Sequence, residues 1–148
     1  MSEISRTALF GKLNSLAYKA IEGATVFCKL RGNPYVELSH WMQQILSTTD
    51  SDVHRITRHF EVDASRLAKD LTEALDRLPR GATSISDLSA HVENAVERGW
   101  VYATLMFGDG RVRSSLCGAT ARTVSDRQRL ATKQPPSTES LPSLTGAP

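Results

Sequence analysis

Residues 8–46 read ALFGKLNSLAYKAIEGATVFCKLRGNPYVELSHWMQQIL, and this stretch decides the fold. Apolar or small residues recur in its first part every three or four positions, which is the spacing of a helix with one buried face. The tripeptide Gly-Asn-Pro at 32–34 ends that helix, because glycine and asparagine tolerate positive φ and proline cannot continue the hydrogen-bond ladder. A second apolar run begins at Val36 and reaches Leu46. The stretch therefore predicts two helices joined by a tight turn.

The same periodicity predicts three more helices further along the chain. Their starts are marked by residues that commonly cap helices: the run Asp50-Ser51-Asp52, then Asp63, then Ser86. The expected ranges are 5–29, with room for a break near Gly11 or Asn14, then 36–46, 52–59, 63–78, and from 86 to Gly99 or Met106. Alternation of period two is absent from the sequence, so the predicted class is all-α, a helical bundle.

A weaker copy of the first turn occurs late in the chain. Gly32 is followed four residues later by Val36, and Gly108 is followed four residues later by Val112. After that point the composition changes, because the last forty residues hold four of the six prolines and are rich in serine, threonine and arginine. Such a segment buries too little apolar surface to offset its ordering entropy. We therefore expect a helical domain over residues 1–113 and a divergent, disordered tail over 114–148.

Length and charge exclude several classes of protein. The chain has 148 residues, enough for one domain, and lacks both a membrane-length apolar run and the layout of a signal peptide, so we expect a cytoplasmic protein. Two cysteines are too few for a disulfide scaffold. Residues 1–108 carry 12 Lys and Arg against 13 Asp and Glu, and residues 109–148 carry 6 against 3. A neutral body argues against nucleic-acid binding, which depends on neutralising phosphates.

The sequence offers no convincing catalytic or metal site. The phosphate-loop pattern G-x-x-x-x-G-K-[ST] does not occur, so we expect no ATPase activity and no bound cofactor. His54 and His59 are five positions apart and fall on different helix faces, which does not suit a shared metal ion. His40 opens a helix, where capping or packing is the simpler role. Cys28 falls on the buried stripe and is expected to act as a small hydrophobic residue.

Two long runs resemble a known family. They are LFGKLNSLAYKAIEGATVFCKLRGNPYVELSHW and DLTEALDRLPRGATSISDLSAHVENAVERGWVYATLMFG. The helix-break-helix in the first is similar to a Clp N-terminal repeat, and both runs closely resemble the N-terminal domain of ClpV, the AAA+ ATPase of bacterial type VI secretion. The resemblance covers about residues 3–113 and implies a Clp N-type helical bundle with its first repeat complete and its second incomplete. After Arg111-Val112-Arg113 the family pattern stops, as a shifted reading frame would cause.

The resemblance also implies a partner. Domains of this family bind an N-terminal helix of the larger type VI sheath protein in an apolar groove, formed by an extra N-terminal helix and the loop that leads into the second repeat. Helix-in-groove binding anchors a few apolar side chains at helical spacing. The positions that match here are Leu9, Phe10, Leu13, Ser84 and Ile85. Phe10 and Leu13 also suit the core, and Ile85 also suits a hydrophobic staple over the next helix.

Three functions remain open at this point. The first is a substrate-recognition module that binds the sheath helix, acts as a monomer and lacks ATPase activity. The second is a non-functional, truncated remnant of the ATPase, in which the incomplete second repeat leaves apolar surface uncovered on the last helix. The third is a small helical DNA-binding regulator, which the neutral body disfavours.

Overall fold

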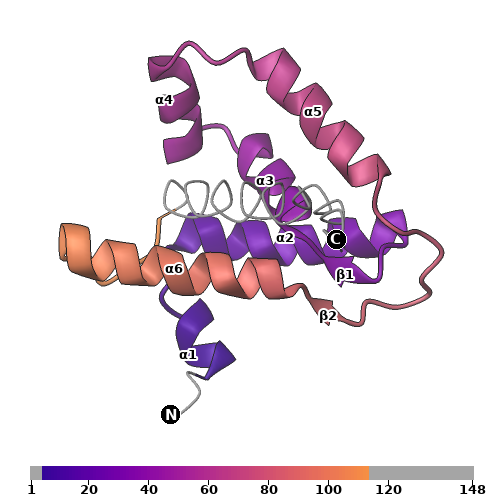
Figure 1. The fold of residues 1–148 in the computed structure, drawn as a ribbon, viewed down its shortest axis with the longest axis horizontal. Helices are drawn as coiled ribbons and strands as arrows, with labels where there is room; N and C mark the ends of the chain where they lie inside the picture. The colour runs from indigo at the N-terminus through magenta and orange to yellow at the C-terminus, as the bar shows by residue number, and fades with distance from the viewer. Residues whose placement is uncertain (1–4, 114–148) are drawn as a thin grey trace, which may run out of the picture.

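The computed structural model describes residues 5–113, and most of these residues are helical (Figure 1). The elements, in chain order, are α1 (Arg6–Phe10), α2 (Ser15–Arg31), β1 (Tyr35–Val36), α3 (Leu38–Ser47), α4 (Asp52–His59), α5 (Ala64–Asp76), β2 (Asp87–Leu88) and α6 (Ala90–Phe107). The predicted all-α class is confirmed, with one short strand pair added. The predicted tail, residues 114–148, lies outside the described residues.

The first predicted helix is two helices in the structure. The chain turns at Gly11, and Asn14 then caps α2 by accepting a hydrogen bond from the Ala17 N–H at 2.9 Å. An asparagine whose side chain satisfies a free amide favours a new helix start over continuation of the old helix. The break therefore extends from Gly11 to Asn14, the two positions near which the sequence allowed a break.

The caps of the middle helices agree with the sequence, and the last cap does not. Ser51 caps α4, and Asp63 caps α5 by accepting from the N–H groups of Ser65 and Arg66. Helix α6 begins after Ser89, although the sequence pointed to Ser86. The residues between these two serines form β2, so their backbone groups pair with another strand and are not available to a helix.

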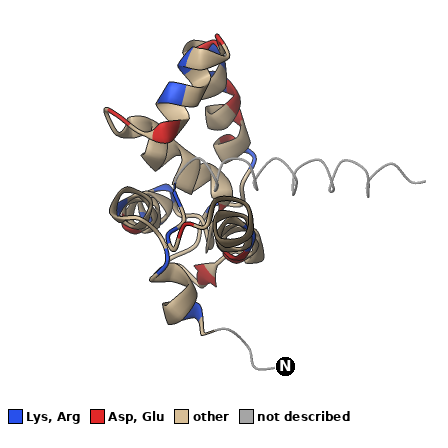
Figure 2. Ribbon diagram, turned by 90° about the vertical axis from the view of Figure 1, so that its left-hand side faces the viewer, with Lys and Arg blue, Asp and Glu red and all other residues tan. Residues whose placement is uncertain are grey.

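Helices α2 and α6 form an internal repeat. They lie side by side and run in opposite directions, with α3, α4 and α5 above them and α1 below (Figures 1 and 2). Their buried positions correspond one to one, each 75 residues apart: Ala17, Ala20, Ile21, Ala24 and Cys28 in α2, and Val92, Ala95, Val96, Gly99 and Ala103 in α6. Both helices end at a glycine with left-handed backbone, Gly32 with φ 70° and Gly108 with φ 61°. The weak repeat in the sequence is therefore real.

Two pairs of short extended segments connect the repeat that contains α2 with the repeat that contains α6. Val36, after the first helix of the pair, lies opposite Leu88, before the second, and Val112 lies opposite Leu13 in the same parallel sense. The residue that caps each long helix donates its N–H across this contact, Asn14 to the Val112 carbonyl and Ser89 to the Val36 carbonyl, both at 2.9 Å. The two valines are fully buried. The last described residues, 111–113, therefore pack against residues 12–14 near the start of the chain.

Helix α3 packs on α2 through a buried tryptophan. Trp41 is 1% exposed, and its indole N–H donates to the Ala17 carbonyl at 3.1 Å. Gly23 of α2 faces α3 as well, and a Cβ there would lie 2.7 Å from the amide oxygen at the flexible end of the Gln44 side chain. The main core therefore lies between α2, α3 and α6, and α1 and Val112 close it.

Candidate functional site

The structure places three of the five predicted contact residues in the core. Leu9 and Phe10 lie at the end of α1, Leu13 lies in the turn before α2, and they are 8%, 8% and 3% exposed. All three belong to the main hydrophobic cluster. For these positions the core role is directly visible, and the groove role stays a prediction.

Ser84 and Ile85 are placed differently, in the loop between α5 and β2. Ser84 is exposed, and Ile85 is half-buried and packs against the edge of the core. The next residue, Ser86, donates its N–H to the Pro34 carbonyl at 2.7 Å, which holds the loop against the end of the first helical pair. Ile85 is therefore fixed in position while part of its side chain remains accessible.

Charged residues connect α1 with the elements that follow this loop. The Arg6 guanidinium Nη1 lies 2.8 Å from Asp87 Oδ1, and its Nη2 contacts Glu93 Oε1. The hydrogen bond from Arg6 and a second one from the Leu88 N–H lower the pKa of Asp87. No local sequence pattern marks this cluster, because Arg6 lies more than eighty residues before both acids.

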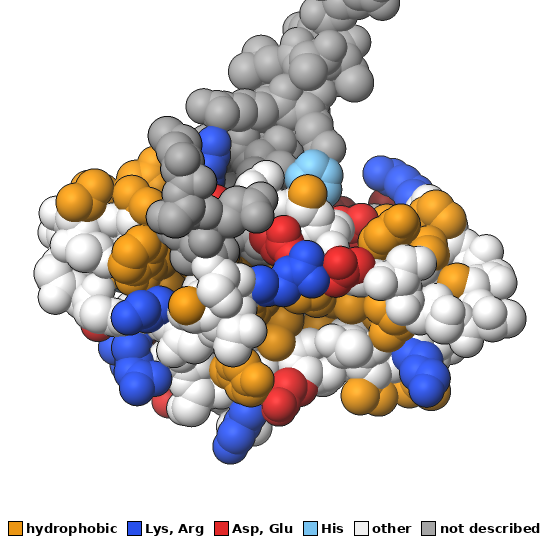
Figure 3. Space-filling model, turned by 90° about the horizontal axis from the view of Figure 1, so that it is seen from below, with side chains coloured by type: hydrophobic (Ala, Val, Ile, Leu, Met, Phe, Trp, Pro, Cys, Tyr) orange, Lys and Arg blue, Asp and Glu red, His pale blue; other side chains and the backbone are white. Residues whose placement is uncertain are grey.

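On the side of the molecule that carries α1, the described side chains in view do not form one apolar strip. Figure 3 shows hydrophobic side chains on this face in several groups, separated by charged and polar side chains. Acidic and basic residues also lie close together on the same elements of the ribbon (Figure 2). A guest helix on this face would therefore meet a mixed surface, with apolar contacts next to ion pairs.

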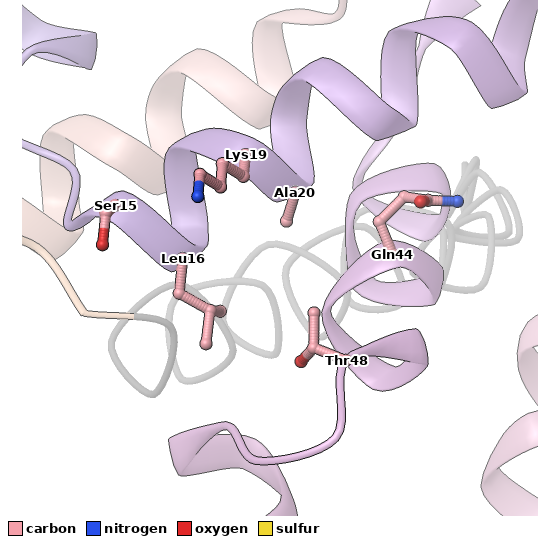
Figure 4. A pocket seen from close by; sticks show the side chains of 6 residues that line it. All are labelled: Ser15, Leu16, Lys19, Ala20, Gln44 and Thr48. Atoms are coloured by element: carbon pink, nitrogen blue, oxygen red, sulfur yellow. The ribbon is translucent and has the colours of Figure 1, made fainter.

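A shallow hollow of about 340 Å³ lies elsewhere, between α2 and α3 (Figure 4). Its lining mixes polar and apolar side chains: Ser15, Leu16, Lys19, Ala20, Gln44 and Thr48. None of these belongs to the five predicted contact residues. Lys19 is the one charged group in the lining and is exposed to solvent, so the hollow has no buried polar group to select a ligand.

His40 and Cys28 are buried and have structural roles. His40 is fully buried; its Nδ1 accepts from the Glu37 N–H at 2.9 Å, and its Nε2 lies 2.9 Å from Asn33 Oδ1. Burial, and then the charge of Arg31, lower the pKa of His40 to about 4. Burial also raises the pKa of the Cys28 thiol, which is the opposite of what a nucleophile needs.

One serine–histidine contact resembles catalytic geometry and is a helix cap. Ser51 Oγ lies 2.7 Å from His54 Nδ1, and His54 Nε2 lies 3.1 Å from the Leu46 carbonyl oxygen. This pair was not among the residues predicted from the sequence. Ser51 is 2% exposed and also accepts the His54 N–H, so its hydroxyl caps α4 and is closed to a substrate. Within residues 5–113, moreover, no three His, Cys, Asp or Glu side chains gather as a metal site would require.

None of the described helices combines the length and apolar composition needed to cross a membrane.

Comparison with known proteins gives a consistent set of relatives. No family model matches the chain. The chain is 76% identical over 114 residues to the AAA+ ATPase ClpV1 of Pseudomonas aeruginosa, a match that covers 77% of this chain and 13% of the ATPase. The chain thus spans about an eighth of the length of that curated relative.

Solved structures agree with this match. One comes from work on the coevolution of the ATPase ClpV, the TssB-TssC sheath and the accessory HsiE protein in two type VI secretion classes. It aligns with a TM-score of 0.80 and 68% identity, over 89% of this chain and 82% of the solved one. A complex of a ClpV N-domain with a VipB peptide aligns with a TM-score of 0.75 over 86% of this chain and 78% of the solved one. At 21% identity, that second likeness establishes the fold alone.

Proposed function

The chain belongs to the family of ClpV N-terminal domains, and from this premise we propose that it is a recognition module for the N-terminal helix of a type VI sheath protein. The observation that carries the proposal is the 76% identity to ClpV1 over 114 residues. A ClpV N-domain of the same fold has been solved with a VipB peptide. A role in recognition without catalysis also suits a chain whose sequence contains no phosphate loop, and we expect no ATP hydrolysis. We also expect a cytoplasmic location.

The proposed contact surface runs from α1 to the loop before β2. A guest helix there would gain most from apolar side chains that stay partly open, because only surface still in contact with water can be buried on binding. Ile85 meets this condition, and Leu9 and Phe10 contribute at most their exposed edges. Ser84, next to Ile85 and exposed, is available to hydrogen-bond a guest.

A titration with a fluorescently labelled peptide from the sheath N-terminus tests the proposal. The full chain should bind the peptide with saturation, and Ile85→Asp should weaken binding at least about tenfold because a desolvated carboxylate opposes an apolar guest. Ile56→Asp is the matched control, since Ile56 is 42% exposed on α4, away from α1 and the 84–85 loop. Binding that is equally lost in both variants, or absent in the unmodified chain, would count against the proposal.

The competing interpretation, a non-functional remnant, has one observation in its favour. The last turns of α6 expose Leu105, Met106 and Phe107 by 80%, 67% and 68%. Exposed apolar surface of this kind accompanies loosely packed states that bind hydrophobic dyes and unfold without cooperativity. Circular dichroism of the full chain separates the two interpretations: a sharp thermal transition supports the recognition module, and a gradual loss of signal supports the remnant.

A further inference from the structure

Helix α1 is too short to hold its place without tertiary contacts. It has five residues, and the side chain of Ser5, which precedes it, makes no capping hydrogen bond. An isolated helix of this length is unstable in water. Its position therefore depends on the burial of Leu9 and Phe10 and on the contacts made by Arg6.

The two acidic partners of Arg6 lie in the elements that follow the loop with Ser84 and Ile85. Asp87 lies two residues after Ile85, and its place is set by the strand pairing opposite Tyr35. Glu93 lies in the first turn of α6; its side chain is 33% exposed, and its Oε1, which faces away from solvent, contacts Arg6 Nη2. Arg6 thus links the short helix α1 to one residue of β2 and one residue of α6.

We propose that Arg6 is a positioning residue for the sheath-helix site: through Asp87 and Glu93 it fixes α1 against the segment that carries Ser84 and Ile85. This inference rests on the proposed function. The side chains that would contact the guest lie on both α1 and the 84–85 loop, so the distance between these two elements determines whether one helix can touch both. Arg6 sets that distance without contacting the guest itself.

The exposure of the ion pairs predicts which measurement should respond. The Arg6 and Asp87 side chains are 51% and 48% exposed, and ion pairs this open to water add little to folding stability. Loss of the link should therefore leave thermal melting nearly unchanged. It should instead alter local order in α1 and, through it, the affinity for the peptide. A residue with only a general structural role would move the melting temperature first.

Peptide titration of single and double variants tests the proposal. Arg6→Ala should weaken binding of the labelled sheath peptide by about fivefold, near the upper range for exposed ion pairs, and Asp87→Ala should weaken it by a smaller factor because the contact with Glu93 remains. The double variant should bind no more weakly than Arg6→Ala alone, because Asp87 acts through Arg6. Arg6→Lys should retain part of the affinity. Arg55→Ala is the control; it removes an exposed 3.2 Å ion pair with Asp50 on another part of the surface and should have no effect.

Hydrogen exchange provides an independent measurement. The amides of Leu9 and Gly11 donate within α1 to Ser5 and Thr7, at 2.9 and 3.0 Å, and should exchange faster in Arg6→Ala while those of α3 do not change. Unchanged exchange in α1, or equal or tighter peptide binding by Arg6→Ala, would overturn the inference while the proposed function stands. Failure of the unmodified chain to bind the peptide would overturn both.

Discussion

Acidification should destabilise this domain through one buried histidine. His40 is fully buried, and its Nδ1 accepts a hydrogen bond from the Glu37 backbone N–H. A backbone N–H can only donate, so Nδ1 must be unprotonated and Nε2 carries the hydrogen that reaches Asn33 Oδ1. Asn33 in turn donates to the Pro79 carbonyl at 2.7 Å. Protonation of His40 would break the first contact of this chain and place a charge inside the protein.

The size of the effect follows from the pKa. In the folded protein the pKa of His40 lies near 4, against 6.5 in the unfolded chain. Above 6.5 neither state binds the proton, and between 6.5 and 4 only the unfolded state does, so stability falls as pH falls through this window. Each tenfold difference in proton affinity corresponds to about 1.4 kcal/mol, which gives a loss of about 3 kcal/mol over the whole window. By about pH 5 the loss should reach about 2 kcal/mol.

Urea unfolding followed by tryptophan fluorescence at several pH values measures this loss. Carboxylates also titrate in acid, so the informative quantity is the difference between the unmodified chain and His40→Gln, which cannot bind the proton. Between about pH 7 and pH 5, the unmodified chain should lose about 2 kcal/mol more than His40→Gln does. His59→Gln, at an exposed position, should follow the unmodified chain. Parallel pH profiles for the unmodified chain and His40→Gln would refute the reasoning.

Two further predictions concern the far end of the described chain. Val112→Asp buries a carboxylate opposite Leu13 and should lower the free energy of unfolding, measured with urea, by about 3 kcal/mol or more. The control is Val101→Asp, at a position that is 41% exposed; it should change the same free energy by under about 1 kcal/mol. Replacing Leu105, Met106 and Phe107 by glutamine should reduce the fluorescence of a bound hydrophobic dye without lowering the melting temperature, since these side chains are already largely exposed; unchanged dye fluorescence would place the dye elsewhere.

Helices could be predicted from the sequence because their signals are local. The apolar spacing of α2 and α5 and the caps Ser51 and Asp63 each lie within one or two turns of the helix that they define. The strand pair could not be found in this way. Each strand has two residues, too few to show alternation, and Val36 pairs with Leu88 through a contact that depends on the whole fold. The same non-local pairing explains why the residue that caps α6 is Ser89 and not the predicted Ser86.

Two histidine roles had a sequence signal that could have been used. His40 lies three residues after Glu37 and His54 three residues after Ser51, the spacing at which a side chain returns to the residue that caps its helix. In both helices the histidine Nδ1 takes the place that glutamate or glutamine usually has in such a capping box. The prediction for His40, capping or packing, includes its observed role. The capping role of His54 was not among the predictions, which treated this residue only as a possible metal ligand.

Core and groove compete for the same side chains, and this limits which residues can carry binding. Leu9, Phe10 and Leu13 are almost fully buried, so a guest gains little new contact from them, and their substitution would damage the core first. A binding defect in Leu13→Asp would therefore say nothing about the groove. Ile85 keeps part of its surface in water, and Arg6 acts at the edge of the core through ion pairs that contribute little to stability. Only at such positions can affinity change while the fold is preserved, so the recognition hypothesis depends on Ile85 and Arg6 more than on the three residues that match the family best.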